Sequence, residues 1–282
     1  EQAGLEINPR DAGISLCWVL TDRWDGRHSD MQLWRLLQPG ALGFALRNAR
    51  EGLVDKVRGA PSRPVQAAAY VAQHARAGDP QDVLRTLDRF SEKERWLMSI
   101  GPEKGPLVSE MAARLPANAR ILELGAYCGY SSIMIAEAFG PQARVTSIEV
   151  SRDSVESARA NVEVAGLSDR IEFLHGPSGS VIPTLDGRFD LVFLDHWKDL
   201  YKGDLQLIEE RGLVGPGSIV VADNVGKIFG AEAYLDYVRN CGHYARENRV
   251  ATVVVGVPYQ MDGTSGAQTE KVIPSTPPIV CR

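Results

Sequence analysis

Hydrophobic and polar positions follow two different patterns along the middle of the chain. Short runs of β-branched and aliphatic residues, typical of buried strands, occupy residues 120–124, 144–150, 171–175, 191–195 and 218–222. Longer stretches with the helical spacing of apolar residues lie between them, at residues 131–139, 153–165, 180–185 and 205–213. Strands that alternate with helices in this way predict a parallel sheet covered on both faces, a Rossmann-like doubly wound α/β fold.

The last part of the chain predicts a change of direction at the sheet edge. A helical pattern at residues 231–240 is followed by two apolar runs, 250–257 and 270–273, which flank a glycine-containing turn at 262–266. Such a pair of runs predicts an antiparallel hairpin. The sequence therefore predicts a mostly parallel, seven-stranded sheet with an antiparallel edge hairpin.

Helices are predicted ahead of the first strand. Helical patterns occupy residues 66–76 and 104–115, and a third helix is expected to begin at Pro80. Proline favours the first turn of a helix, so Gly78-Asp79-Pro80 separates the helix at residues 66–76 from the helix that begins at Pro80.

Residues 1–63 differ from the rest and are predicted to be an N-terminal extension of a single domain at 64–282. The first methionine is Met31, so residues 1–30 have two interpretations: native sequence, or non-native or processed sequence ahead of that start. Residues 41–58 have a helical apolar face. We expect this helix to pack on its own domain; the alternative is peripheral contact of residues 33–58 with a membrane or a partner.

Composition and charge exclude several classes of function. The net charge is −5 and no basic surplus marks the C-terminal two-thirds, which argues against a nucleic-acid partner. No apolar run reaches the ~18–20 residues of a transmembrane helix. The four cysteines are scattered, so neither a disulfide framework nor a zinc site is indicated. A cytoplasmic protein is expected.

The turn after the first predicted strand has the features of a cofactor site. Gly125 and Gly129 are spaced Gly-x-x-x-Gly, at the strand end where open α/β sheets bind ligands. The Glu123 carboxylate would repel a pyrophosphate but favour a cationic sulfonium. Glu149 ends the second strand and could accept both ribose hydroxyls. The sequence therefore predicts S-adenosylmethionine in preference to NAD.

Two later strand ends carry hard oxygen ligands. Asp195 ends the fourth predicted strand, and Asp223 and Asn224 follow the fifth. If these strands are neighbours, the three side chains converge, and carboxylate and amide oxygens suit Mg²⁺ or Ca²⁺ better than zinc. A divalent cation beside Lys198 would favour its neutral amine, which could act as a general base. The alternative for Lys198 is an exposed ion pair with Asp199.

Residues 122–131, 192–199 and 222–225, read together, closely resemble the catechol O-methyltransferase family, whose members are Mg²⁺-dependent and use S-adenosylmethionine. Gly78-Asp79-Pro80-Gln81 and Trp96-x-Met98 also look like that family. The resemblance covers about residues 64–273 and makes 64–282 an O-methyltransferase domain.

The resemblance implies a role for each matching position. Asp195, Asp223 and Asn224 would hold Mg²⁺, and Lys198 would be the catalytic base. The cofactor would be bound by Ile100, Glu123, Gly125, Tyr127, Tyr130, Ser131, Glu149, Val150, Ser178, Asp195, His196 and Trp197. The acceptor would contact Trp96, Met98, Trp197, Lys198 and Asn224. Tyr127 and Tyr130 could equally be ordinary packing residues instead of walls of the cofactor site. For Cys128 we expect a packing role and no redox role.

The chain departs from the family at the acceptor pocket. Gly256 aligns with a glutamate that holds the second catechol hydroxyl, Ile228–Phe229 replaces a proline wall, and Gly179 replaces a glutamine. The expected function is methyl transfer to one hydroxyl of a catechol-like small molecule. The alternatives are another natural product with adjacent hydroxyls, and a low-turnover binding module with a methyltransferase fold.

Overall fold

The fold was examined in a computed structural model, which describes residues 15–21, 59–225 and 230–250 and the single positions 50, 55 and 57. Seven strands form one sheet in the order β4-β3-β2-β5-β6-β1-β7, and every pairing in it is parallel. The strands are β1 (Ser15–Thr21), β2 (Arg120–Leu124), β3 (Arg144–Glu149), β4 (Ile171–His175), β5 (Leu191–Leu194), β6 (Ile219–Ala222) and β7 (Tyr244–Val250).

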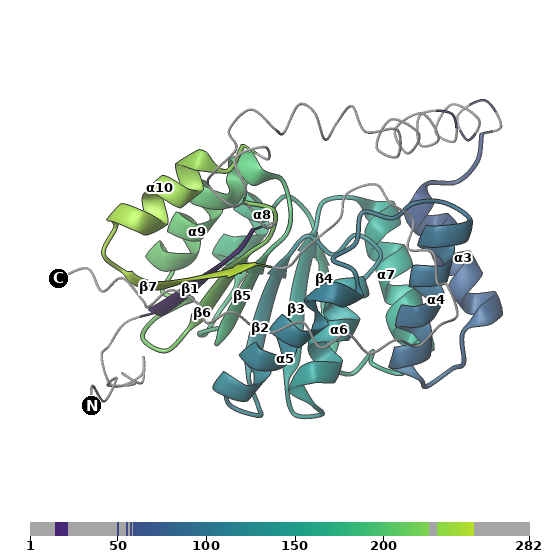
Figure 1. Ribbon diagram of the computed structural model, residues 1–282, viewed down its shortest axis with the longest axis horizontal. Coiled ribbons are helices and arrows are strands. Elements are labelled where there is room, and N and C mark those ends of the chain that lie inside the picture. Colours follow the sequence, from purple (N-terminus) through teal and green to yellow (C-terminus); the bar gives the residue numbers. More distant parts are fainter. Residues whose placement is uncertain are drawn as a thin grey trace, which may run out of the picture.

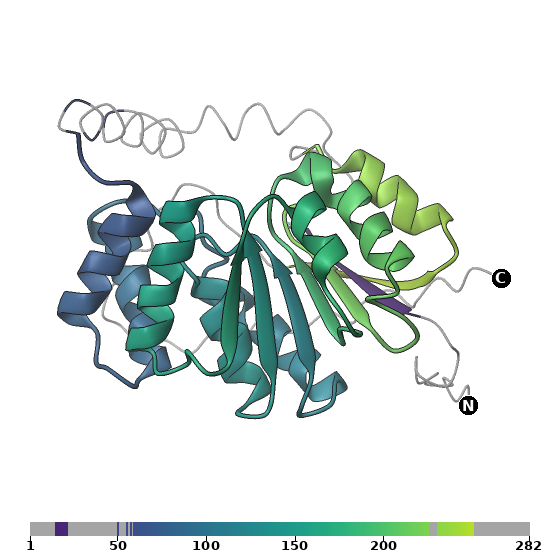
Figure 2. The same cartoon turned by 180° about the vertical axis from the view of Figure 1, so that it is seen from behind.

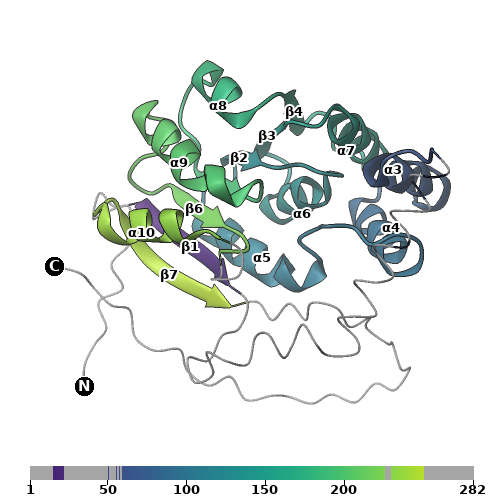
Figure 3. The ribbon, with the colours of Figure 1, turned by 90° about the horizontal axis from the view of Figure 1, so that it is seen from above.

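Helices cover both faces of this sheet. They are α3 (Arg63–His74), α4 (Pro80–Lys93), α5 (Gly105–Arg114), α6 (Tyr130–Phe139), α7 (Arg152–Val164), α8 (Ser178–Val181), α9 (Tyr201–Glu210) and α10 (Glu232–Asn240). Side chains alternate across β2, so that Ile121 joins the core under α3–α7 and Leu122 joins the core under α8–α10. Figure 3 shows α5 and α6 on one side of the strands and α8 and α9 on the other.

The local signals in the sequence place the helices α4 to α10, although α9 begins at Tyr201, four residues before the predicted start at 205. Asp79 caps α4 by accepting a hydrogen bond from the Asp82 backbone N–H at 2.9 Å, and Pro80 begins the helix. The five central strands begin and end within one residue of their predicted bounds. The predicted α/β fold, with a parallel sheet between two helical layers, is therefore confirmed.

The edge of the sheet differs from the prediction. β1 comes from the predicted extension and lies between β6 and β7, pairing Trp18 with Val221 and with Glu247. Figures 1 and 2 show these first and last strands side by side. The edge strand β7 is parallel to β1, and the predicted hairpin lies, except for Val250, outside the described residues. Pairing between residues more than 200 positions apart leaves no local signal.

The predicted helix at residues 41–58 lies mostly outside the described residues, although positions 50, 55 and 57 are helical. Asp55 accepts hydrogen bonds from the Arg95 guanidinium, with Nε···Oδ2 and Nη2···Oδ1 distances of 3.1 Å. This ion pair ties the segment to the loop that follows α4. Within the residues described, none of the helices is long and apolar enough to cross a membrane.

Candidate active site

Four neighbouring strands end at the same edge of the sheet and carry the predicted site residues. Leu194, the last residue of β5, is paired with Leu124 of β2 and with Ala222 of β6. Asp195 and Asp223 follow at once, and their backbone N–H groups donate to Leu124 O and Leu194 O at 2.9 Å. The parallel strand order therefore brings the predicted cofactor loop and the predicted metal ligands together.

The glycines of the loop are required by contacts within the protein. Gly125 has a φ of +100°, and a Cβ there would lie 2.4 Å from the Asp195 carbonyl oxygen. Gly129 has a φ of +81° and faces Ala158 of α7. Contacts within the protein therefore explain these glycines without a ligand, because only glycine fits between the elements.

Glu149 organises the same loop from the end of β3. Its Oε2 accepts hydrogen bonds from the backbone N–H groups of Ala126 at 3.2 Å and Tyr127 at 3.0 Å, and its Oε1 accepts one from Ser151 at 2.8 Å. Tyr127 has a left-handed backbone, with a φ of 48°, which is uncommon for a bulky residue. The carboxylate therefore stabilises a strained turn, a task that its sequence position did not reveal.

Glu123 lies fully buried beneath the loop. The hydroxyls of Ser132 and Ser147 donate to its Oε2, and Ser131 is a further hydroxyl partner. Burial raises the pKa of Glu123 above its usual range, although the hydrogen bonds from these hydroxyls lower it. Its Oε1 has no hydrogen-bond partner within the described part of the chain, so one acceptor remains beneath the predicted cofactor site.

Two other residues of the loop are packed into the protein. Tyr130 is buried, and its hydroxyl donates to Asp88 of α4 at 3.2 Å, which favours the packing alternative over a cofactor wall. Cys128 is fully buried, its carbonyl accepts a hydrogen bond from Asn161, and burial raises the pKa of the thiol to about 12. A thiol of this kind is inert, as expected.

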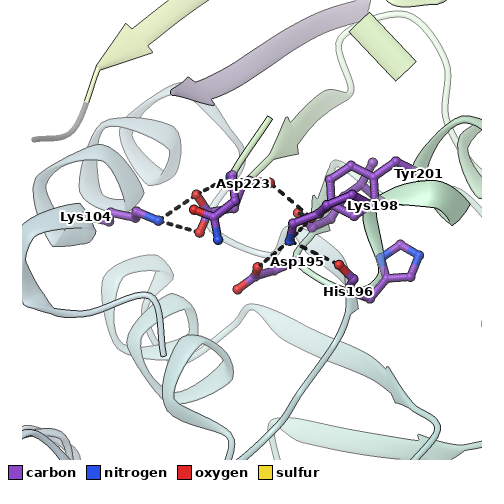
Figure 4. A network of polar contacts seen from close by, with 8 residues as sticks. Lys104, Asp195, His196, Lys198, Tyr201 and Asp223 are labelled. Carbon is purple, nitrogen blue, oxygen red and sulfur yellow. Dashed lines mark hydrogen bonds and ion pairs between the residues drawn. The ribbon is translucent and has the colours of Figure 1, made fainter. Parts of the chain in front are cut away.

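Two carboxylates and two lysines meet at the ends of β5 and β6 (Figure 4). The Lys104 Nζ lies 2.6 and 2.5 Å from the two oxygens of Asp223. Burial, and then the charge of Asp223, raise the pKa of Asp195 from 3.8 to about 7, although both lysines lower it. The two acidic groups are therefore close enough to disfavour each other's charge.

Lys198 points into this group and does not pair with Asp199. Its Nζ donates to the Tyr201 hydroxyl at 2.9 Å and to the His196 carbonyl at 3.1 Å, and it lies 3.4 Å from Asp195 Oδ1. The buried Tyr201 hydroxyl in turn reaches Leu194 O at 2.8 Å and Asp223 O at 3.1 Å. One tyrosine thus fixes the lysine and spans both strand ends.

His196 turns away from the carboxylates. Its Nε2 lies 2.7 Å from Asp204 Oδ2 of α9, on the side away from Asp195 and Asp223. Its Nδ1 is buried without a partner among the described side chains and backbone. Ser178, another predicted cofactor residue, begins α8 three positions after the end of β4, at the same edge of the sheet as His196.

Exposed apolar side chains lie on the loops after α4, β3 and β5. Trp96 is 37% exposed, Met98 66% and Trp197 74%. Val150 is also exposed, whereas Ile100 is buried in the core. Exposed apolar side chains mark a ligand-binding surface only where they form one contiguous patch.

The donor set fits a hard divalent cation. No three His, Cys, Asp or Glu side chains in the described ranges lie close enough to hold a metal, so the two aspartates would need the amide of Asn224. Asn224 has a left-handed φ of 54°, a conformation that asparagine tolerates better than most residues. Two carboxylates, one amide oxygen and waters are a typical Mg²⁺ set.

Sequence reasoning missed three residues of the site: Lys104, Tyr201 and Asp204. Tyr201 falls three residues after Lys198, a spacing that could have indicated their contact, whereas Asp204 lies eight residues from its partner His196. Lys104 is 119 residues from Asp223 along the chain and gave no signal.

Comparisons with known proteins identify the family. The family model described as O-methyltransferase matches residues 74–252. Bovine catechol O-methyltransferase is 40% identical over 199 residues, covering 67% of this chain and 72% of that protein. A probable O-methyltransferase of Mycobacterium tuberculosis is 43% identical over 186 residues, covering 63% of this chain and 78% of that protein.

A solved structure of an SAH-bound Podospora anserina methyltransferase aligns with a TM-score of 0.47 and 28% identity, over 57% of this chain and 68% of that one. The chain belongs to the O-methyltransferase family. The predicted family and enzyme class are therefore confirmed.

Proposed function

We propose that this chain transfers the methyl group of S-adenosylmethionine to one hydroxyl of a catechol-like small molecule, with Mg²⁺ bound at Asp195, Asp223 and Asn224. The observation that carries the proposal is the position of Lys198, whose Nζ lies 3.4 Å from Asp195 Oδ1 at the strand edge. A potential base thus lies beside a potential metal ligand. The similarity to bovine catechol O-methyltransferase supports the same reaction.

The cofactor would lie along the ends of β2, β3 and β4. Glu149 and the Gly125 turn would face the ribose and the methionine end, while Ser178, His196 and Trp197 would surround the adenine. Ile100, Tyr127, Ser131 and Val150 complete the proposed set. Bound S-adenosylmethionine would supply an electrophilic methyl group, and bound Mg²⁺ would stabilise negative charge on the acceptor oxygens.

Lys198 is the proposed general base. As the free amine it would take the proton from the acceptor hydroxyl whose oxygen receives the methyl group, so the proton ends on Nζ. Its contacts with Tyr201 and the His196 carbonyl hold Nζ in place for this transfer. Holding the reacting groups in line is a large part of the catalytic effect in such sites.

The acceptor is proposed to be a planar aromatic diol. Trp96, Met98 and Trp197 leave apolar surface exposed, and Trp197 follows Asp195 by two positions. An aromatic ring would contact these side chains while its adjacent hydroxyls reach the metal. Gly256 and Ile228–Phe229, which depart from the family, lie outside the described residues, so other vicinal diols stay an alternative.

A turnover assay with labelled S-adenosylmethionine and a panel of catechols and larger vicinal diols tests the proposal. We expect methylated product with Mg²⁺, loss of turnover in excess chelator, and recovery on adding Mg²⁺. Cofactor binding should survive chelation, because the loop around Gly125 does not depend on the metal ligands. Turnover in excess chelator would contradict the metal role, and no turnover on any acceptor would favour a binding module.

A further inference from the structure

A buried ion pair joins Asp223, one of the proposed metal ligands, to Lys104, a residue to which the proposed reaction gives no role. Lys104 ends the short 3₁₀ turn Pro102–Lys104, just before α5, and reaches Asp223 at the end of β6. The two side chains are 5% and 2% exposed. Figure 4 shows Lys104 approaching Asp223 from the opposite side to Lys198.

The Asp223 carboxylate is almost fully engaged. The Lys104 Nζ contacts both oxygens, and the backbone N–H of Asn224 donates to Oδ1 at 2.8 Å. A carboxylate has about four lone-pair positions, so roughly one remains, on Oδ2. A divalent cation would therefore share Asp223 with an ammonium group that is already in place.

In the fully ionised site the charges balance before any cation binds. Asp195 and Asp223 carry two negative charges when ionised, and Lys104 and Lys198 carry two positive charges as ammonium groups. A divalent cation would lie next to the Lys104 ammonium on the same carboxylate. Repulsion between neighbouring buried charges is weakly screened by water and salt.

We propose that Lys104 is a resident counter-ion of the metal site. It holds Asp223 in place and balances its charge when no divalent cation is bound, and it weakens the affinity of the site for that cation. The inference rests on the metal part of the proposed function.

Folding alone offers a competing explanation for the pair. Buried ion pairs that are broken on one side destabilise a protein whatever else they do. A lysine that only supported Asp223 would lower metal affinity when removed, because the ligand would lose its position. A lysine that opposes the cation raises the affinity when removed. The direction of the change separates the two roles.

The first measurement is Mn²⁺ affinity of the full chain, by calorimetry and by the electron paramagnetic resonance signal of free Mn²⁺, without acceptor. We expect Lys104→Met to bind Mn²⁺ about tenfold more tightly or better than wild type. Its melting temperature should rise more on Mn²⁺ addition than that of wild type. Lys202→Met, an exposed position on α9, makes the same charge change and should behave like wild type.

A second pair of variants tests the effect of the Lys104 charge when there is no Asp223 carboxylate for Lys104 to hold in position. Asp223→Asn leaves the Lys104 ammonium facing a neutral amide, whereas the double variant Lys104→Met/Asp223→Asn removes both charges. No carboxylate at 223 is left to be positioned. We therefore expect the double variant to bind Mn²⁺ more tightly than Asp223→Asn, and this pair decides the matter alone if Lys104→Met does not fold.

Asp195→Asn identifies Mn²⁺ bound at this site, since it should weaken that binding, as the loss of any ligand carboxylate would. If wild type binds Mn²⁺ there but neither Lys104 variant binds more tightly than its parent, the inference is overturned and the metal site stands. If no variant and no wild-type protein shows Mn²⁺ binding that depends on Asp195, the inference and the metal part of the proposed function are both overturned.

Discussion

Single residues at the strand ends combine tasks that are usually described separately. Glu149 accepts three backbone hydrogen bonds that shape the turn after β2, so it belongs to the loop as well as to the proposed ribose site. Tyr201 donates its hydroxyl proton to one strand end while accepting a hydrogen bond from Lys198. Loss of either residue should therefore change the shape of the site as well as its chemistry.

Glu149→Ala should destabilise the protein even without cofactor. Leaving a fully buried backbone N–H group without a partner costs about 1–3 kcal/mol, and two of the three groups bound by Glu149 are partly buried, so we expect a lower free energy of unfolding and weaker cofactor binding. Denaturant unfolding of the ligand-free protein and calorimetric titration with cofactor measure the two effects. Glu156→Ala, an exposed glutamate on α7, is the matched control. Unchanged stability with weaker cofactor binding would mean that Glu149 serves the ligand alone.

Lys198→Ala should lower kcat by ~10²-fold or more, the range expected for a general base, with little change in cofactor affinity. The reason is its position 3.4 Å from Asp195 Oδ1 inside the site. Steady-state kinetics at saturating cofactor measure the effect, and Lys202→Ala on α9 controls for loss of a nearby positive charge. Turnover close to wild type would assign proton removal to another group.

The elements that could be predicted are those whose signals are local. Strands β2–β6 and helices α4 and α6 follow from apolar spacing, caps and glycine turns within each segment. Asp195, Asp223 and Lys198 could be placed at one edge because parallel strands end together. β1 could not be placed, since its partners lie about 200 residues away, and Lys104 could not be linked to Asp223 for the same reason.

Removing residues 1–21 should lower the melting temperature. β1 lies between β6 and β7, so its loss would expose the edge of β6 and deprive β7 of its described neighbour. We expect thermal unfolding at a lower temperature and faster hydrogen exchange in β6. Removal of residues 1–14 alone, which spares β1, is the control. An unchanged melting temperature would return residues 1–21 to the role of a separate extension.

At the scale of the whole molecule, burial of the Asp195 carboxyl group makes the stability of the fold depend on pH. The pKa of Asp195 is raised from 3.8 to about 7, chiefly by burial and by Asp223. Below pH 3.8 this group is neutral in both the folded and the unfolded chain. As the pH rises towards 7 the unfolded chain ionises first, so stability is lost through this interval.

Asp195→Asn should therefore gain stability relative to wild type as the pH rises. In metal-free protein we expect the difference in free energy of unfolding to grow between pH 4 and about 7 and to level off above it. Denaturant titrations at several pH values measure the difference, and Asp199→Asn, an exposed neighbour, gives the baseline. A difference independent of pH would show that Asp195 is not perturbed in the folded protein.

The contact between Gly125 and Asp195 also bears on how new acceptor specificities could arise in this protein. A single methyl group at position 125 would collide with the Asp195 backbone, so the turn proposed to bind the methyl donor and the strand end that carries a proposed metal ligand cannot move independently. Neither can be reshaped by small steps without disturbing the other. Directed evolution towards other diols should therefore accumulate substitutions at the exposed residues Trp96, Met98 and Trp197, which can change without moving either strand end.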